Sequence, residues 1–403
     1  MSQTIPAALF RATALTRAGR LSEATRLIQE TLSGVPAGEA SERAAPAKTA
    51  LLLPDLTATR GPAVAEAPPP RPDSPFRPAP RVPRPLGQTV RDLAEWRKSL
   101  GEMPLARPAR STPPTIPAGA QYLSRTFACA AGARAYRLYV PASLEGRPRG
   151  LVLMLHGCKQ NPDDFAVGTR MNEKAQAAGL LVVYPEQPSA VNPMSCWNWF
   201  DPAHQDRDRG EPAILAGLAE AVAAEFDVPR THVFVAGLSA GGAMAAILAD
   251  VYPEVFAAAG VHSGLAAGAA RDVPSAFAAM NGSAGAARPA PRRGSAGAAR
   301  LIVFHGTADR TVHPSNGEAI LSGRGTGGAP ADAPQRGTSP DGRAYTRIVH
   351  RRPDGIAELE HWSIEGAGHA WSGGDRAGSF ADPVGPDASD EMVRFFLDGA
   401  GPA

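Results

Sequence analysis

The pentapeptide Gly-Leu-Ser-Ala-Gly at positions 237–241 places a serine between two glycines. An apolar run at 233–236 precedes it, and an alanine-rich segment at 242–249 follows it. This order predicts a strand, a sharp turn and a helix, with the hydroxyl of Ser239 pushed out of the turn at the helix N-terminus. Glycine has no Cβ, so the strand and the helix can approach closely around the serine. We therefore predict that Ser239 is a nucleophile.

A serine hydroxyl is a poor nucleophile at its ordinary pKa, so it needs a histidine base and a carboxylate that orients this base. Asp309 follows the apolar run at 301–305. His369 lies on a glycine-rich loop after the apolar residues 362–364. The chain order of serine, acid and base, with the last two on loops after late strands, is the order that this strand–turn–helix arrangement uses. We assign Asp309 as the orienting acid and His369 as the base.

Other histidines and one aspartate compete for these two roles. His305 and His313 lie too close to the loop of the acid, and His361 precedes the last predicted strand instead of following it. His262 ends the strand after the serine's helix, a position that favours a structural or pocket-lining role. Asp272 would place the acid one strand earlier and stays open as the alternative acid.

Acyl transfer also needs hydrogen-bond donors for the negative charge that develops on the substrate oxygen. The backbone N–H of Ala240, at the start of the predicted helix, supplies one donor. The second should come from the loop after an earlier strand, where Leu-His-Gly-Cys occupies positions 155–158. We assign the N–H of Cys158 to this role, with that of Gly157 as the alternative.

From about residue 121 onward, short apolar segments alternate with segments of helical character. This alternation predicts an α/β fold, with a mostly parallel, doubly wound sheet and crossover helices. The continuous apolar run at 150–156 is typical of a strand buried on both sides. We expect strands at 126–129, 135–140, 150–156, 180–184, 232–236, 255–262, 301–305 and 362–364, and helices near 163–178, 213–226 and 387–397.

Three regions differ in composition. Residues 1–35 have the apolar spacing of an amphipathic helical hairpin. Residues 36–118 form a Pro/Ala/Arg-rich linker that we expect to be largely disordered, since such a segment cannot build a packed core. Residues 119–400 form the predicted catalytic domain. Within it, the stretches 281–300 and 322–344 are rich in small residues and are expected to be surface insertions.

The composition excludes several classes of protein. The 403-residue chain carries a net charge of +2, which disfavours a nucleic-acid-binding protein. No apolar run of about twenty residues occurs, so no transmembrane helix is expected. The N-terminal residues lack a basic segment followed by an apolar core, so the sequence predicts no secretory signal and a cytoplasmic location. Motifs for nucleotide or metal cofactors are absent, and no cofactor is expected.

Five motifs follow one another along the chain, and together they resemble the polyhydroxybutyrate depolymerase family of esterases over residues 120–398. Their order is similar to that of the unpermuted (type 1) catalytic domain of this family, which has the α/β-hydrolase fold. The motifs are His-Gly-Cys-x-Gln at 156–160, Cys-Trp-Asn-Trp-Phe at 196–200, Gly-Leu-Ser-Ala-Gly-Gly at 237–242, His-Gly-x-x-Asp at 305–309 and Gly-x-Gly-His-x-Trp at 366–371.

The resemblance implies a carboxylic ester hydrolase that cleaves short-chain polyhydroxyalkanoates, as 3-hydroxybutyrate polyester or oligomers, through an acyl-enzyme. It assigns the roles of nucleophile, acid, base and oxyanion donor to the same residues as above. It also implies a disulfide between Cys158 and Cys196. Feruloyl and acetylxylan esterases share the same motifs, so a carbohydrate esterase is the alternative. Aromatic faces suit an ester chain, and the residues expected to contact the substrate are Trp197, Trp199, Trp371 and His156.

A hypothesis of a different class makes residues 6–33 an anchor for a polymer granule or a protein partner, with hydrolysis as a secondary activity. Secreted depolymerases carry a signal peptide and often a separate polymer-binding domain, and neither is visible in this sequence. The family that the chain resembles is often extracellular, which stands against the cytoplasmic location expected from the N-terminus. Of the three cysteines, Cys129 would be left without a partner.

Overall fold

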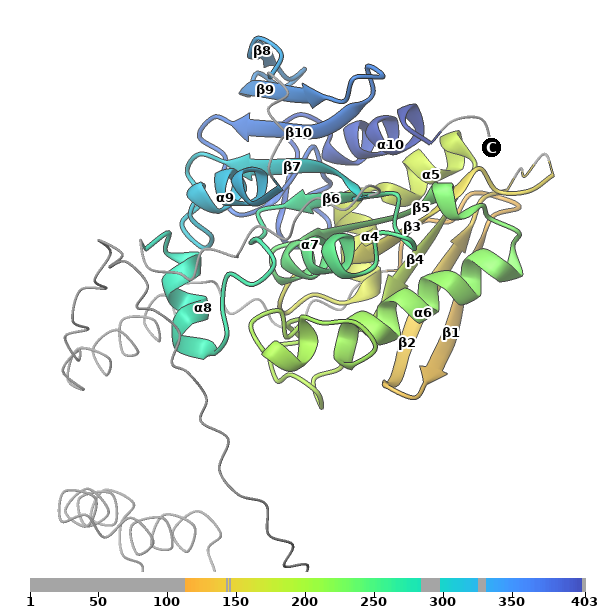
Figure 1. Ribbon diagram of the computed structural model, residues 1–403. Helices are drawn as coiled ribbons and strands as arrows, with labels where there is room; N and C mark the ends of the chain where they lie inside the picture. Colours follow the sequence, from red (N-terminus) through yellow and green to blue (C-terminus); the bar gives the residue numbers. More distant parts are fainter. Residues whose placement is uncertain (1–112, 143, 145, 284–297, 325–330, 401–403) are drawn as a thin grey trace, which may run out of the picture. The chain divides into compact units, whose positions relative to one another are not determined.

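The computed structural model describes most of the chain beyond the predicted linker (Figure 1). The predicted hairpin at 1–35, and with it the expected anchor, lies outside the described residues, as does most of the predicted linker. Residues 113–118 belong to no helix or strand. The described residues are 113–142, 144, 146–283, 298–324 and 331–400.

A single large sheet runs through the described part of the chain, in the order β1-β2-β4-β3-β5-β6-β7-β10-β9-β8. The six central strands, which are β4, β3, β5, β6, β7 and β10 in sheet order, are parallel to one another. Antiparallel strands complete the sheet at each end. In Figure 1 the β8–β9 end and the β1–β2 end lie on opposite sides. The strands are β1 (Gln121–Cys129), β2 (Gly132–Val140), β3 (Gly150–Leu155), β4 (Leu180–Pro185), β5 (Val233–Leu238), β6 (Ala258–His262), β7 (Arg300–Gly306), β8 (Gln335–Thr338), β9 (Ala344–Arg351) and β10 (Ala357–Ile364).

Helices cover both faces of this sheet, and each face has its own apolar core. On one face lie α6 (Gly210–Glu225), α7 (Ala240–Val251), α8 (Val273–Met280) and α9 (Ser315–Arg324). On the other face lie α4 (Pro162–Thr169), α5 (Met171–Ala178) and α10 (Ala388–Asp398). Smaller elements are the 3-10 turns η1 (Pro202–His204) and η2 (Arg230–His232) and the parallel pair β11 (Trp371–Ser372) and β12 (Ala381–Asp382). The α/β-hydrolase fold predicted from the sequence is confirmed.

The parallel strands explain where the site can form. Every residue of β3, β4, β5, β6 and β7 is buried, as expected for strands with a helical layer on both faces. In an open parallel sheet, functional residues gather beyond the carboxyl ends of the strands. Ser239, Asp309 and His369 follow β5, β7 and β10, respectively, so all three lie at this edge.

Two predicted elements differ from the structure. The helix expected over 163–178 is two helices, because Arg170 adopts a left-handed conformation (φ 55°) between α4 and α5. Residues 322–344 were expected to be an insertion without regular structure, but residues 335–338 form β8, which pairs with β9. The composition of this stretch resembles a loop, and only the antiparallel pairing with β9 makes it a strand.

A buried carboxylate ties β10 to the elements around it. Glu360, on β10, is fully buried and receives two hydrogen bonds from Arg347 of β9, at 3.0 and 2.7 Å. Arg394 of α10 donates a third bond of 2.7 Å to the same carboxylate. Burial of a charge is tolerated when it is paired and fully hydrogen-bonded. The strand that leads to His369 is thus joined to its neighbouring strand and to the last helix.

Candidate active site

The serine turn has the geometry that the sequence predicts. Ser239 has φ 58° and ψ −119°, a backbone conformation that residues other than glycine rarely adopt. Helix α7 begins at the next residue. A Cβ built on Gly237 would lie 2.4 Å from backbone atoms of Gly241, and one built on Gly241 would lie 2.0 Å from the carbonyl oxygen of Leu155. Both glycines are therefore required for the close packing of β5, β3 and α7 around the serine.

The structure joins the predicted acid to the predicted base. The ring Nδ1 of His369 lies 2.7 Å from Oδ2 of Asp309. The other carboxylate oxygen, Oδ1, accepts the backbone N–H groups of Thr311 and Val312, both at 2.9 Å. A carboxylate only accepts hydrogen bonds, so Nδ1 of His369 carries the proton and Nε2 keeps its lone pair. This tautomer is the one that a general base requires.

Burial and hydrogen bonding act in opposite directions on Asp309. Its burial in the loop after β7 alone would raise the pKa of the carboxyl. The hydrogen bond and the charge of His369, together with the N–H of Val312, outweigh burial and hold the pKa below its ordinary value. Asp309 is therefore ionised at neutral pH and is able to stabilise a protonated His369.

Backbone contacts hold the two loops that carry Asp309 and His369 against each other. The N–H of Ala308 donates to the carbonyl of Ala367 at 3.0 Å. A Cβ on Gly306 would lie 2.3 Å from the same carbonyl oxygen, so the loops could not approach this closely with any other residue at position 306.

His262, at the end of β6, connects the serine turn with the histidine loop. Its carbonyl accepts the N–H of Ser239 at 2.9 Å, and its ring Nε2 accepts the N–H of Ser372 at 3.1 Å. The ring stacks on Trp371, and its burial lowers the pKa to about 3. His262 is therefore neutral and supports the structure, which agrees with the role favoured from its position in the sequence.

The competing residues lie in other positions. Asp272 is exposed and caps the N-terminus of α8 by accepting the N–H of Ser275 at 2.8 Å. The carboxylate that contacts His369 is that of Asp309, not that of Asp272. His313 is exposed and bonds to Ser315. His361 lies on β10 itself, ahead of the loop that carries the base.

His305 has a role that the sequence did not indicate. This buried histidine lies with Nε2 2.8 Å from the carbonyl of Val312 and 3.6 Å from Oδ2 of Asp309. A carbonyl can only accept, so Nε2 carries the proton. His305 thereby fixes Val312, whose own N–H binds the other oxygen of Asp309. His305 thus stabilises the position of Asp309 through Val312, and it does not take the place of His369.

The candidate oxyanion donors lie beside the serine. A Cβ on Gly157 would be 3.6 Å from the Cβ of Ser239. The N–H of Gly157 already donates to Oε1 of Gln160 at 2.9 Å, which disfavours Gly157 as the donor. The N–H of Cys158 has no acceptor within the described residues. Ala240 is the first residue of α7, where N–H groups have no partner within the helix.

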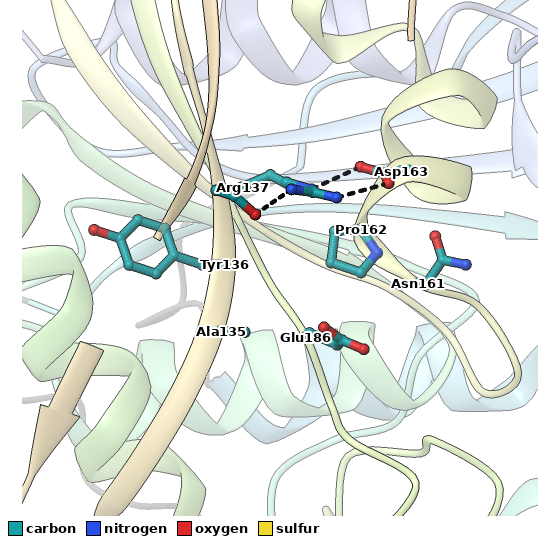
Figure 2. A pocket seen from close by; sticks show the side chains of 8 residues that line it. Ala135, Tyr136, Arg137, Asn161, Pro162, Asp163 and Glu186 are labelled. Atoms are coloured by element: carbon teal, nitrogen blue, oxygen red, sulfur yellow. Dashed lines mark hydrogen bonds and ion pairs between the residues drawn. The ribbon is translucent and has the colours of Figure 1, made fainter. Parts of the chain in front are cut away.

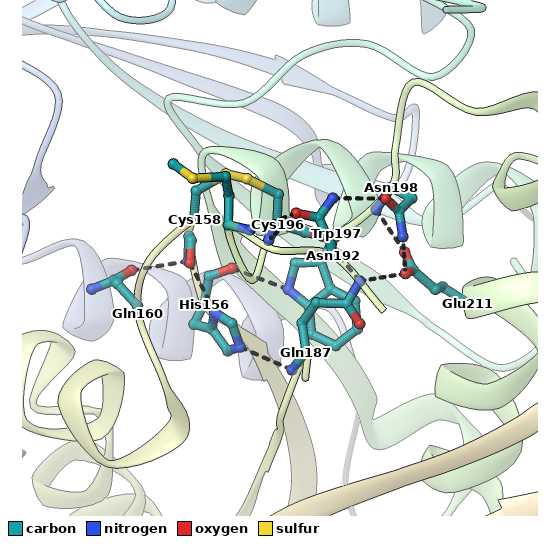
Figure 3. Close-up of a disulfide and its surroundings, with 11 residues drawn as sticks. His156, Cys158, Gln160, Gln187, Asn192, Cys196, Trp197, Asn198 and Glu211 are labelled. Carbon is teal, nitrogen blue, oxygen red and sulfur yellow. Dashed lines mark hydrogen bonds between the residues drawn. A yellow bond between two sulfur atoms is a disulfide. The ribbon is translucent and has the colours of Figure 1, made fainter. Parts of the chain in front are cut away.

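Cys158 and Cys196 form a disulfide, as the resemblance implied (Figure 3). Around it, the ring nitrogen of Trp197 donates to the carbonyl of His156 at 3.0 Å, and the N–H of Gln187 donates to Nε2 of His156 at 3.1 Å. The side chain of Gln187 also donates to the carbonyl of Cys196 at 2.9 Å. One covalent bond and a buried hydrogen-bond network therefore hold the segment that carries Cys158.

The expectation that three tryptophans and His156 contact the substrate requires a correction. Trp197 and His156 are 0% exposed, Trp371 is 1% exposed and Trp199 is 5% exposed. Trp371 packs into the core beneath the histidine loop, with its ring nitrogen 3.1 Å from Oγ of Ser389. Aromatic composition indicated contact area, but it could not distinguish a groove wall from a support behind the groove.

Within the part of the chain that the structure describes, no helix combines the length and the apolar character needed to cross a membrane. Among the same residues, no three His, Cys, Asp or Glu side chains are placed to share a metal ion. Cys129, at the end of β1, is a free and exposed cysteine.

Comparison with known families identifies residues 134–323 as a match to the family described as "Esterase PHB depolymerase". Poly(3-hydroxyalkanoate) depolymerase C of Paucimonas lemoignei is 29% identical over 239 residues, which cover 54% of this chain and 54% of that protein. The chain thus spans about half the length of this relative. Feruloyl esterase B of Neurospora crassa is 28% identical over 284 residues, which cover 64% of this chain and 86% of that protein.

Two further proteins extend the comparison. Acetylxylan esterase A of Talaromyces purpureogenus is 29% identical over 262 residues, which cover 57% of this chain and 68% of that protein. Among solved structures, an acetyl xylan esterase from Aspergillus awamori matches with a TM-score of 0.54 and 21% identity, covering 69% of this chain and 99% of that one. The structural match supports the fold.

Proposed function

We propose that this chain is a serine esterase, on the premise that the match over residues 134–323 places it in the PHB depolymerase family of esterases. The observation that carries the proposal is the bond of 2.7 Å between Asp309 and His369, at the same sheet edge as the turn that presents Ser239. We propose residues 119–400 as the catalytic unit, because this range contains every residue to which the mechanism assigns a role.

In the first half of the reaction, Oγ of Ser239 attacks the carbonyl carbon of the ester, and its proton moves to Nε2 of His369. The carbonyl oxygen becomes an oxyanion that accepts the N–H groups of Cys158 and Ala240. When the tetrahedral intermediate collapses, the bond to the alcohol oxygen breaks. His369 returns its proton to that oxygen, and an acyl-serine remains.

In the second half, a water molecule donates its proton to His369 and attacks the acyl carbon. The same two N–H groups stabilise the second oxyanion. Collapse breaks the bond to Oγ of Ser239, which regains the proton from His369, and the free acid leaves. Throughout, Asp309 keeps the ring of His369 in the required tautomer and stabilises its charged form, while remaining ionised itself.

The serine is tested by Ser239→Ala, which removes the nucleophile without adding volume. We expect hydrolysis of p-nitrophenyl butyrate to fall by at least about 10⁴-fold, with unchanged far-UV circular dichroism and thermal unfolding. Ser322→Ala, on the exposed side of α9, is the matched control and should retain full activity. Full residual activity in Ser239→Ala would overturn the assignment.

Two substrate classes fit this chemistry. The match to a poly(3-hydroxyalkanoate) depolymerase supports short-chain hydroxyalkanoate polyester or its oligomers. The matches to feruloyl and acetylxylan esterases support a carbohydrate ester about equally well. Turnover of 3-hydroxybutyrate oligomers, methyl ferulate and acetylated xylan by the same preparation distinguishes these classes. A preference of at least tenfold in kcat/KM assigns the substrate.

A further inference from the structure

The carboxylate of Asp164, in the first turn of α4, is buried and bonds to two segments that flank the candidate site. From the oxyanion segment at 156–160, Nε2 of Gln160 donates to Oδ2 at 3.0 Å. From the loop at 373–380, which joins β11 to β12, the N–H of Ser379 donates to Oδ1 at 2.9 Å and its hydroxyl donates to Oδ2. All three donors are uncharged. A buried carboxylate is costly unless it is fully hydrogen-bonded, so these contacts and the helix N-terminus are what stabilise it.

Gln160 connects this carboxylate to the oxyanion segment. Its Oε1 accepts the N–H of Gly157 at 2.9 Å, directly ahead of Cys158 (Figure 3). Its Nε2 donates to Asp164 and, at 2.9 Å, to the carbonyl of Ser379. A carboxylate only accepts hydrogen bonds, so Asp164 requires the NH₂ side of the amide to face it and leaves the oxygen for Gly157. Asp164 therefore orients the side chain that fixes the peptide ahead of the proposed oxyanion donor.

Ser379 connects the same carboxylate to the base. The next residue, Phe380, has φ 52°, which is unfavourable for a bulky side chain and persists only where neighbouring contacts fix it. The bonds from Ser379 to Asp164 hold one side of this residue. On the other side, the N–H of Trp371 donates to the carbonyl of Phe380 at 2.7 Å. The ring of Phe380 meets the ring of His369 edge to face, with centroids 6.4 Å apart.

Backbone packing keeps the loop at 373–380 against α4. The N–H of Asp375 donates to the carbonyl of Gly168 at 2.9 Å. A Cβ built on Gly378 would lie 2.4 Å from the Cα of Gly168, so the two backbones are in direct contact. The position of α4 therefore determines where this loop lies.

We propose that Asp164 is a positioning residue, which fixes the oxyanion segment and the loop beside His369 relative to each other. A donor stabilises the oxyanion fully only if it is in place before the charge appears. The base must be aligned with the same reacting carbon. One carboxylate bonded to both segments satisfies the two requirements together. The inference rests on the proposed esterase function and adds a residue to it.

The neighbouring Asp163 provides a matched control. It lies in the same turn of α4 as Asp164, but it lines a polar pocket of about 270 Å³ between β1, β2, the start of α4 and Glu186 (Figure 2). Its carboxylate accepts two hydrogen bonds from Arg137 of β2, at 3.0 and 3.1 Å, and one from the hydroxyl of Tyr122 at 3.1 Å. Asp163→Asn therefore weakens an ion pair of the same helix turn without changing a contact of either segment.

The direct test is Asp164→Asn, which keeps the volume of the side chain. Whichever way the new amide turns, its NH₂ group faces a donor, either Nε2 of Gln160 or the N–H of Ser379. We expect kcat on p-nitrophenyl butyrate to fall about tenfold, with KM within about twofold. A trifluoromethyl ketone adds to Oγ of Ser239 and forms an oxyanion like that of the intermediate, so its Ki should rise about tenfold. Asp163→Asn should keep kcat and Ki within about twofold of the wild type.

A second variant and a readout that needs no turnover complete the test. Ser379→Ala removes one donor to Asp164 at a half-buried position and should lower kcat about threefold. In Asp164→Asn, the backbone N–H groups of Gly157 and Trp371 should both exchange with deuterium at least about tenfold faster than in the wild type. Asp163→Asn should exchange like the wild type at both positions.

The outcomes separate the positioning role from the esterase itself. Unchanged kcat and Ki in Asp164→Asn and Ser379→Ala, or an equal fall of kcat in Asp163→Asn, would overturn the role. Faster exchange at only one of Gly157 and Trp371 would overturn the link between the two segments. If Asp164→Asn does not fold, an unchanged kcat in Ser379→Ala is sufficient to reject the proposal. If the wild-type protein hydrolyses no ester, the proposed function fails, and the exchange experiment alone then decides whether Asp164 links the segments.

Discussion

The two halves of the candidate site are held in different ways. The half proposed to stabilise the oxyanion, around Cys158, is fixed by a disulfide to Cys196 and by hydrogen bonds of Gln187 and Trp197 to His156 and Cys196. The half proposed to move the proton, Asp309 and His369, depends on one bond of 2.7 Å and on backbone contacts between two loops. The first half is cross-linked into the fold, whereas the second depends on loop geometry.

This difference agrees with the part that each half plays in the proposed reaction. An oxyanion donor must stay fixed, because its contribution comes from preorganisation before the charge appears. The base must accept and return a proton, so its ring needs a partner that tolerates both protonation states. Asp309 provides this through an ionised carboxylate. A disturbance of the proton-moving half should therefore affect the rate most, and a disturbance of the cross-linked half should affect stability most.

The largest expected effect is on the proton-moving half. Asp309→Asn would replace the acceptor by an amide that favours the wrong tautomer of His369, and kcat on p-nitrophenyl butyrate should fall by about 10⁴-fold. Asp272→Asn is the matched control, since asparagine caps a helix as well as aspartate does and activity should be retained. A loss of activity in Asp272→Asn with full activity in Asp309→Asn would reverse the assignment of the acid.

The cross-linked half should respond through stability. Cys196→Ser removes a disulfide between residues separated by 38 positions, which should lower the free energy of unfolding by roughly 4 kcal/mol in the chain-entropy model. We expect kcat to fall about tenfold, since the N–H of Cys158 loses its fixed position. Urea unfolding and turnover of p-nitrophenyl butyrate measure the two effects. Cys129→Ser should change neither, because this thiol is free and exposed.

Equal stability of Cys196→Ser and the wild type would mean that the hydrogen bonds alone hold the segment.

The disulfide also bears on the cellular location of the protein. Such bonds persist in oxidising compartments and are rare in the cytoplasm of mesophiles. It therefore weighs against the cytoplasmic location expected from the N-terminal sequence.

Both halves also share a sensitivity to acid. His156 and His262, one in each half, are buried and neutral, and burial lowers their pKa values to about 4 and about 3. In the unfolded chain each should titrate near pH 6.5, so the unfolded state binds protons that the folded state excludes. Stability is thus fully present above about pH 6.5 and declines as the pH falls, by about 1.4 kcal/mol per pH unit for each histidine. A free energy of unfolding that stays constant from pH 7 to pH 5 would contradict this.

The sequence predicted the parts of the site that depend on chain order and local turn chemistry. Ser239 lies on the predicted turn, because the glycines at 237 and 241 allow the strand and the helix to approach closely where a Cβ would clash. The parallel strands follow from their continuous apolar runs. Asp309 and His369 could be placed on loops from their positions after such runs. In the structure their side chains are in contact.

Other features depend on contacts between distant segments, which local patterns do not report. The hydrogen bond from Gly157 to Gln160 disfavours one of the two proposed oxyanion donors, and composition could not have distinguished them. The roles of Trp197 and Trp371 depend on which layer covers each ring. The polar pocket lined by Arg137, Asp163 and Glu186 combines four separate segments of the chain. Its side chains are ordinary surface residues until β1, β2, β4 and α4 come together.

The backbone of Ser239 has a consequence for the evolution of this chain. A non-glycine residue with this conformation costs on the order of 1–3 kcal/mol, which the surrounding sheet and helix must offset. Glycine would relieve that strain at position 239, but it would remove the hydroxyl. Stability alone would therefore favour glycine at this position, so a strained serine here agrees with the role of nucleophile that we propose for Ser239.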